Sequence, residues 1–276
     1  MKIRMISFLV VLGFLLSFAV GCSSGKNQKE TLETTPAATE ENAPEYERIY
    51  HMFTQQRLVF CVDEKYGYLD EKGNEVIPAK FNWAMDFYDG LACVMEGDWE
   101  SGGTWGFIDS NGNYVINPVY SNAMSFNESG LAPVAEGDKW GYINQKGEYV
   151  IEPQYEYAFQ FAKNGKAQVT VNDKYGYIDL SGDFVIEPKF DDAFEFENGY
   201  AAVMIGDWMT GKWGYIDEKG EYLVEPQFEE AYHFTTDGYA MVVKDGKCGL
   251  IDRSGNLVVD CKYDALYGNF PGMAEN

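Results

Sequence analysis

Basic residues are scarce in this chain of 276 residues. Only 21 lysines and arginines stand against 44 aspartates and glutamates, so the formal net charge is −23. A surface of that sign repels phosphate backbones and anionic lipid headgroups. The sequence therefore predicts no nucleic-acid partner, and any attachment to a membrane has to come from something other than surface charge.

Histidine is rarer still, since His51 and His233 are the only two, and we expect His233 to be structural. The chain contains no zinc-protease His-Glu-x-x-His pair, phosphate-binding glycine loop or nucleophile elbow. Its carboxylates are spread evenly, about one to each recurring turn, whereas a calcium ion takes six to eight oxygens. We therefore expect no metal, no cofactor and no enzymatic activity; a hydrolase using two carboxylates is the least favoured alternative.

The first 45 residues have the features of targeting segments. Lys2 and Arg4 precede an apolar run over residues 6–20, which is typical of a secretory signal and short for a membrane span. The AVGC sequence that ends at Cys22 resembles a lipobox, where bacterial lipoproteins are cleaved and lipidated. We expect a lipoprotein signal peptide over residues 1–21 and a lipid on Cys22; the alternative is an ordinary signal peptide with an incidental cysteine.

Residues 22–45 are predicted to be a disordered tether. Their only large aliphatic side chain is Leu32, so they bury too little apolar surface to offset the entropy of ordering. With Cys22 lipidated, the tether would hold the rest of the chain on the extracytoplasmic face of a cell membrane or envelope.

The remaining chain is an internal repeat. An aromatic residue precedes glycine at 66–67, 105–106, 140–141, 175–176 and 213–214, and 248–249 is a Cys-Gly copy. The spacing is 35 residues with two short insertions. Asp or Asn follows each glycine by three residues, a second glycine follows by six, and an aromatic residue by fourteen. Such a fixed period predicts a repeat architecture.

These copies resemble the WG-repeat family of bacterial repeats. The resemblance rests on the WGYID sequence at 213–217, the glycine that follows it, and the VIEP run, as at 150–153. It covers about residues 46–274. It implies an architecture and carries no general activity.

The alternation within each copy has a period of two, which predicts strands. We expect an all-β array of six repeats, each with three strands and one irregular crossing segment. A degenerate half-repeat over residues 46–62 precedes repeats that start near residues 66, 105, 140, 175, 213 and 248. An open stack, a β-solenoid or superhelical array, is favoured over a closed six-bladed propeller-like ring, because blades usually take ~40–50 residues. The aromatic–glycine pairs are expected to be core residues.

Two hairpins depart from the repeat and carry the same tripeptide. They contain Gly-Asp-Trp at 97–99 and at 206–208. A tryptophan on a protruding loop exposes a large apolar face, which is unusual unless something covers it. We therefore identify the candidate ligand contacts as Trp99, Trp208, Asp98 and Asp207. The alternative is that each tryptophan folds back on its own repeat.

The sixth copy replaces both the aromatic residue and the later proline with cysteine, at Cys248 and Cys261. The two flank a turn between antiparallel strands, and a secreted chain meets an oxidising compartment. We expect a disulfide there, with two free apolar cysteines as the alternative. Together these features favour a non-catalytic, membrane-anchored scaffold that binds an envelope protein or a ligand. The second candidate is a carbohydrate or cell-wall binding module.

Overall fold

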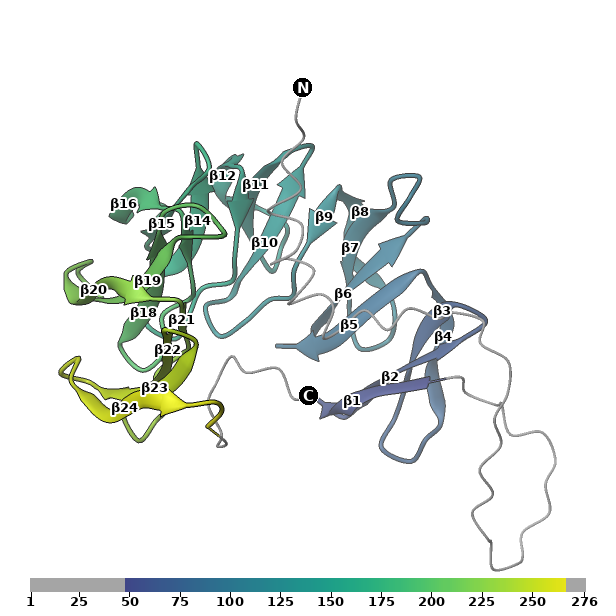
Figure 1. The fold of residues 1–276 in the computed structure, drawn as a ribbon. Helices are drawn as coiled ribbons and strands as arrows, with labels where there is room; N and C mark the ends of the chain where they lie inside the picture. The colour runs from purple at the N-terminus through teal and green to yellow at the C-terminus, as the bar shows by residue number, and fades with distance from the viewer. Residues whose placement is uncertain (1–47, 267–276) are drawn as a thin grey trace, which may run out of the picture. The chain divides into compact units, whose positions relative to one another are not determined.

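The computed structural model of the protein describes the backbone of residues 48–266 and the side chains of residues 55–266. The predicted signal peptide, the lipidated Cys22 and the tether lie outside the described residues. Residues 48–266 contain 24 strands and no helix, so the predicted all-β class is confirmed (Figure 1). It follows that this part of the chain has no helix with the length and hydrophobicity needed to cross a membrane.

The strands form six four-stranded antiparallel sheets, and within each sheet they are neighbours in chain order. The first sheet contains β1 (Arg48–Thr54), β2 (Arg57–Val62), β3 (Lys65–Leu69) and β4 (Glu75–Phe81). The second contains β5 (Trp83–Tyr88), β6 (Leu91–Glu96), β7 (Thr104–Ile108) and β8 (Tyr114–Tyr120). The third contains β9 (Asn122–Ala123), β10 (Leu131–Glu136), β11 (Lys139–Asn144) and β12 (Tyr149–Tyr155).

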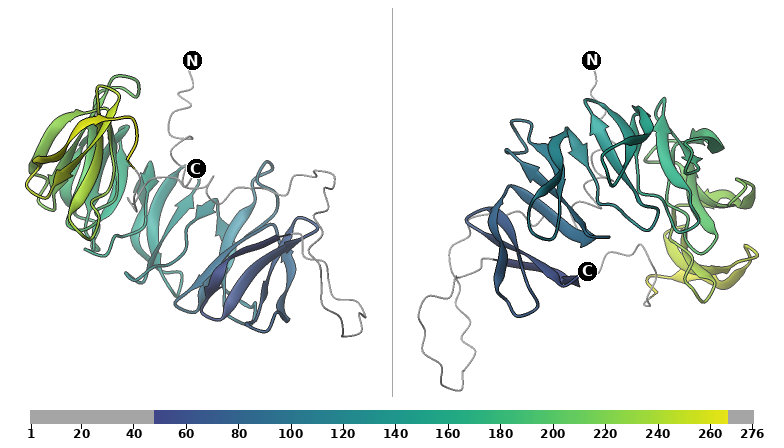
Figure 2. Two further views of the ribbon diagram at one scale, coloured as in Figure 1. Left: turned by 60° about the horizontal axis from the view of Figure 1, so that its bottom comes forward. Right: turned by 180° about the vertical axis from the view of Figure 1, so that it is seen from behind.

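The same order continues to the end of the described residues. The fourth sheet contains β13 (Tyr157–Ala158), β14 (Ala167–Val171), β15 (Lys174–Ile178) and β16 (Phe184–Phe190). The fifth contains β17 (Asp192–Ala193), β18 (Tyr200–Ile205), β19 (Lys212–Asp217) and β20 (Tyr222–Phe228). The sixth contains β21 (Glu230–Ala231), β22 (Tyr239–Lys244), β23 (Lys247–Asp252) and β24 (Leu257–Tyr263). The sheets follow one another as an open array of repeats (Figure 2).

Each sequence repeat is divided between two sheets. The repeat that starts at Trp105 supplies β7 and β8 to the second sheet and β9 and β10 to the third. The expectation of three strands per repeat is wrong by one, because the crossing segment begins with a strand of its own. In the third sheet this strand is β9, whose Ala123 pairs with Val134 of β10. β1 and β2 lie within the residues of the predicted half-repeat.

The glycine of the aromatic–glycine pair is required by a close approach between strands. Trp140 of β11 pairs with Tyr155 of β12, and Tyr142 pairs with Ile151, so residues 152–154 bulge over one glycine. A Cβ on Gly141 would lie 2.4 Å from the Ile151 carbonyl oxygen and 2.7 Å from a backbone nitrogen in the bulge. Real Cβ atoms do not approach backbone atoms so closely, and this position therefore excludes every side chain.

The recurring Asp, which is Asn144 in the third copy, closes the turn between the third and fourth strands of each sheet. In the second repeat, Asp109 Oδ1 accepts hydrogen bonds from the backbone N–H groups of Asn111 and Asn113, both at 2.9 Å. These bonds hold the pKa of Asp109 below its usual value, and those from Asn113 have the largest effect. Gly112 supplies the positive φ of 81° that the turn needs. The carboxylate is thus part of the turn and has no need of a metal ion.

The hydrophobic core lies between successive sheets, and buried tyrosines join the sheets at four of the five boundaries. Tyr142 is fully buried, and its hydroxyl donates to the Phe159 carbonyl oxygen at 2.7 Å, across the boundary between the third and fourth sheets. Its ring packs on the buried Phe161 with a centroid separation of 4.8 Å. The same hydroxyl-to-carbonyl bond, 17 residues along the chain, is made by Tyr68, Tyr177 and Tyr215.

The sixth sheet ends the described array, and the disulfide expected there is absent. Cys248 and Cys261 are both free thiols. The register pairs Cys248 with Tyr263, and the Cys261 sulfur instead lies over Gly249. The expectation that the two cysteines face each other is wrong, because the bulge over the glycine shifts the register of the two strands.

Candidate functional site

Two long hairpin loops, residues 97–103 and 206–211, carry the predicted contact residues. In the first, Asp98 Oδ1 accepts a hydrogen bond from the Ser101 backbone N–H at 2.6 Å. In the second, Asp207 accepts from the N–H groups of Met209 and Thr210 and, at 2.9 Å, from the Thr210 hydroxyl. The bonds from Ser101 and Thr210 lower the pKa of Asp98 and Asp207 respectively. Both carboxylates therefore shape their loops.

The two tryptophans of these loops lie on the surface. The Trp99 side chain is 55% exposed and Trp208 is 63% exposed, and the neighbouring Met209 reaches 87%. Trp99 lies edge-to-face against Trp105, which lies in the next strand of the same sheet, with ring centroids 6.2 Å apart. Among residues 55–266, Trp208 has no such ring partner. Trp99 is thus partly folded back, as the alternative interpretation holds, while Trp208 is open.

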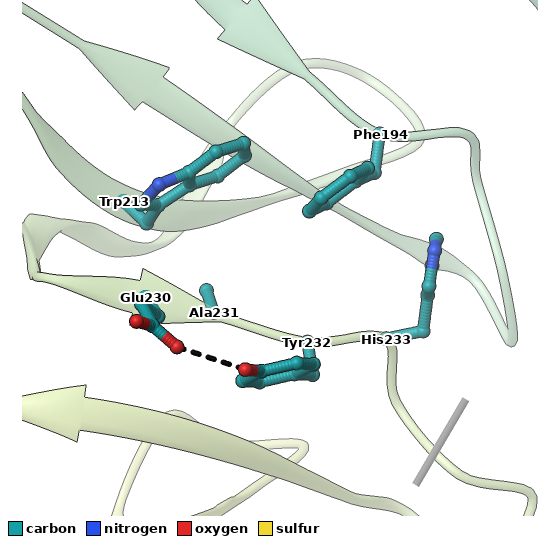
Figure 3. Close-up of a pocket in the computed structure, with 6 residues that line it drawn as sticks. All are labelled: Phe194, Trp213, Glu230, Ala231, Tyr232 and His233. Atoms are coloured by element: carbon teal, nitrogen blue, oxygen red, sulfur yellow. Dashed lines mark hydrogen bonds between the residues drawn. The ribbon is translucent and has the colours of Figure 1, made fainter. Parts of the chain in front are cut away.

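A third candidate lies between the fifth and sixth sheets. It is an open pocket of about 200 Å³, and its lining consists of Phe194, Trp213, Glu230, Ala231, Tyr232 and His233. The Trp213 and Phe194 rings are stacked, with centroids 4.9 Å apart and planes 13° apart. Figure 3 shows this pair on one side of the pocket, with Glu230 and Tyr232 on the other. The Tyr232 hydroxyl donates to Glu230 Oε2 at 2.8 Å.

His233 forms the inner end of this pocket and is buried. Its Nδ1 lies 3.6 Å from Glu197 Oε2, and its ring packs against Phe194 at 5.3 Å. Burial lowers the pKa of His233, because an imidazolium ion is poorly solvated there. The imidazole is therefore neutral at pH 7, and the expectation of a packed structural histidine agrees with this placement.

Comparison with known families identifies the repeat. The sequence profile described as "WG containing repeat" matches residues 66–98, 105–140, 140–175, 175–207, 213–248 and 249–274. The chain belongs to the WG-repeat family. The six matches agree with the repeat starts read from the sequence. No curated protein is significantly similar in sequence.

Two solved structures resemble this WG-repeat protein at low sequence identity. One, described as the crystal structure of the eukaryotic initiation factor, is 10% identical with a TM-score of 0.56, over 81% of this chain and 67% of that one. Hsv2p of Kluyveromyces lactis is 10% identical with a TM-score of 0.48, over 76% of this chain and 81% of that one. The first likeness concerns the fold alone, and the TM-score of the second supports no conclusion about this chain.

The residue that faces the aromatic–glycine pair from the next sheet differs among the WG repeats. Sixteen residues after the repeat glycine, the first and third copies have an aromatic residue that packs on the tryptophan or tyrosine of the pair. Tyr157 covers Trp140 in this way at 4.8 Å. The fifth copy has Glu230 at that position, and Trp213 stays partly exposed where Trp140 is buried. The second and fourth copies have Asn122 and Asp192 at the same position. Glu230 is therefore visible in the aligned repeats, but it does not by itself distinguish the fifth copy.

Within residues 55–266, no three His, Cys, Asp or Glu side chains are grouped so that they could hold a metal ion.

Proposed function

We propose that this WG-repeat protein is a non-catalytic binding scaffold, held by a lipid on Cys22 at the extracytoplasmic face of a cell membrane. Its partner is a protein or a glycan of the cell envelope. The observation that carries the proposal is the exposed apolar surface of the two long loops, where Trp208 and Met209 lack cover. Large aromatic side chains of this exposure are typical of interaction sites.

The loops are suited to binding because they are shaped before any partner arrives. Asp207 holds its loop through three hydrogen bonds, and the Gly206 N–H donates to Asp191 Oδ2 at 2.9 Å. A loop that is ordered in advance loses less conformational entropy on association. The non-catalytic role is supported by the turn aspartates, whose carboxylates accept backbone hydrogen bonds in copy after copy.

The test compares the full chain with a Trp99→Ala/Trp208→Ala variant. Partners are cross-linked in the native envelope, identified, and then titrated against both proteins, and a glycan array is run in parallel. We expect each exposed tryptophan to contribute on the order of 2 kcal/mol, or about thirtyfold in Kd, with Trp208 the larger of the two. A matched control is Leu180→Ala, which removes an exposed apolar side chain from another hairpin. Unchanged capture by the double variant, or a large fall in its melting temperature, would contradict the proposal.

The anchor has its own test. Cys22→Ser removes the acceptor of the lipid, so the variant is expected to move from the detergent phase to the aqueous phase on partitioning and to lose metabolic lipid label. Retention of the label would show that the lipid is elsewhere. Because this measurement does not involve the loops, it separates failure of the anchor from failure of the binding surface.

A further inference from the structure

We propose that the pocket between the fifth and sixth sheets binds an organic cation, an alkylated ammonium group received between the Trp213 and Tyr232 rings and beside the Glu230 carboxylate. This inference goes beyond the scaffold role and stands whether or not the tryptophan loops bind an envelope partner. It rests on three features of the pocket, which are the ring faces, the charge and the small number of hydrogen-bonding groups.

The first feature is the aromatic surface offered by Trp213 and Tyr232. Trp213 is stacked on Phe194 and remains partly exposed, and Tyr232 lies across the pocket from this pair (Figure 3). The face of an indole is the best aromatic surface for a cation, since the ring quadrupole places negative potential there. Phe194 covers one face of Trp213, so the cation would lie on the other face. Stacking on Phe194 also restrains the Trp213 ring, so the surface is ordered without a ligand.

The charge of the pocket has the sign that a cation requires. The six lining residues include Glu230 and no lysine or arginine. Glu230 accepts the Tyr232 hydroxyl through one oxygen and, in the described part of the chain, forms no ion pair. His233 is neutral at pH 7, and Glu197 lies directly behind it. An anion would be repelled from this pocket, and the chain as a whole carries −23.

The hydrogen-bonding groups are too few for a sugar. A buried sugar hydroxyl without a partner is costly, so a sugar site needs several donors and acceptors. Here the Tyr232 hydroxyl already donates to Glu230, which leaves a Glu230 oxygen, the Trp213 indole N–H and the His233 imidazole among the lining side chains. A fully alkylated ammonium group needs none of these bonds and requires only ring faces and a counter-charge. The lining therefore favours the cation.

The experiment is a calorimetric titration of the full chain with choline and with 3,3-dimethyl-1-butanol. The second compound has the same shape with carbon in place of the charged nitrogen. We expect saturable binding of choline and about tenfold weaker binding of the neutral compound. Equal binding of both would overturn the proposal in favour of an apolar pocket, and a lack of saturable binding by either would overturn it outright. N-Acetylglucosamine is titrated as the sugar arm, and binding of that sugar in place of choline would also overturn the proposal.

Three variants in the lining and one control variant, Trp208→Ala, locate the site. Trp213→Ala and Glu230→Gln are each expected to weaken choline binding, the first about tenfold and the second several-fold, since glutamine keeps an acceptor for Tyr232 and loses the charge. Glu230→Tyr restores the aromatic cover that Tyr157 gives Trp140, so it should fill the pocket and abolish binding without loss of stability. Trp208→Ala leaves the lining intact and should bind choline normally even if it no longer captures an envelope partner. Choline binding unaffected by Glu230→Tyr would refute the assignment.

Discussion

Replacing Gly141 with alanine tests the close approach on which every repeat depends. The new Cβ would lie 2.4 Å from the Ile151 carbonyl oxygen and 2.7 Å from the Pro153 nitrogen. Both are backbone atoms of β12, so relief requires the strand itself to move away from β11. Overpacking of this kind costs roughly 1–3 kcal/mol, and a backbone obstacle places the loss near the upper end. The reduced entropy of the unfolded chain offsets less than about 1 kcal/mol. We expect a net loss of about 2–3 kcal/mol.

The assay is urea unfolding of the two purified proteins, followed by tryptophan fluorescence and near-ultraviolet circular dichroism. The matched control is Gly137→Ala in the turn before β11, where φ is 61° and nothing lies within 4 Å of the added Cβ. The only cost in that variant is the left-handed backbone conformation of the alanine, which should lower the free energy of unfolding by about 1 kcal/mol. If Gly141→Ala is no more destabilising than Gly137→Ala, the close approach does not explain the glycine.

Two further predictions concern the links between sheets and the charge in the fifth sheet. Tyr142→Phe leaves the part-buried Phe159 carbonyl without its hydrogen bond and should cost about 1–2 kcal/mol in urea unfolding. Phe107→Tyr, at the matching position of the second repeat, should not destabilise. Equal losses in both variants would contradict this. Partial burial raises the pKa of Asp192 to about 6, so its contribution to stability is fully present below pH 3.8 and is lost as the pH rises to about 6. Asp192→Asn should therefore stabilise the fold by about 1 kcal/mol at pH 7.5, after allowance for solvent screening, and should have no effect at pH 3.5. The reverse change at the matching position of the second repeat, Asn122→Asp, should destabilise the fold at pH 7.5. A gain in stability that is independent of pH would exclude the carboxylate as the cause.

Much of the architecture follows from the sequence alone. A period of two within each copy determines strands, because successive side chains of a strand point to opposite faces. The fixed spacing of Gly67 to Gly249 determines six repeats, since one copy cannot bury both faces of its short strands. The glycine of each aromatic–glycine pair indicated a close approach between backbones, and the aromatic residue of the pair, such as Trp140, indicated a core position. Both inferences rest on the recurrence of these residues at the same position of each repeat.

Other features were decided only by the tertiary structure. The two-residue strand at Asn122–Ala123 exists because β10 lies beside it, and two residues carry too little pattern to show this in the sequence. Cys248 faces Tyr263 because a bulge shifts the register, and the length of a bulge depends on how closely two backbones meet.

Of the candidate sites, the tryptophan loops could be predicted from the sequence and the pocket could not. Trp208 was identified from the sequence because its loop is longer than the other turns of the array. The pocket was not, because it needs Glu230 of one sheet to lie opposite Trp213 of the sheet before it. The sequence of a repeat gives the identity of each residue but not which side chain of the neighbouring sheet that residue covers. This contact is determined only when the sheets pack together.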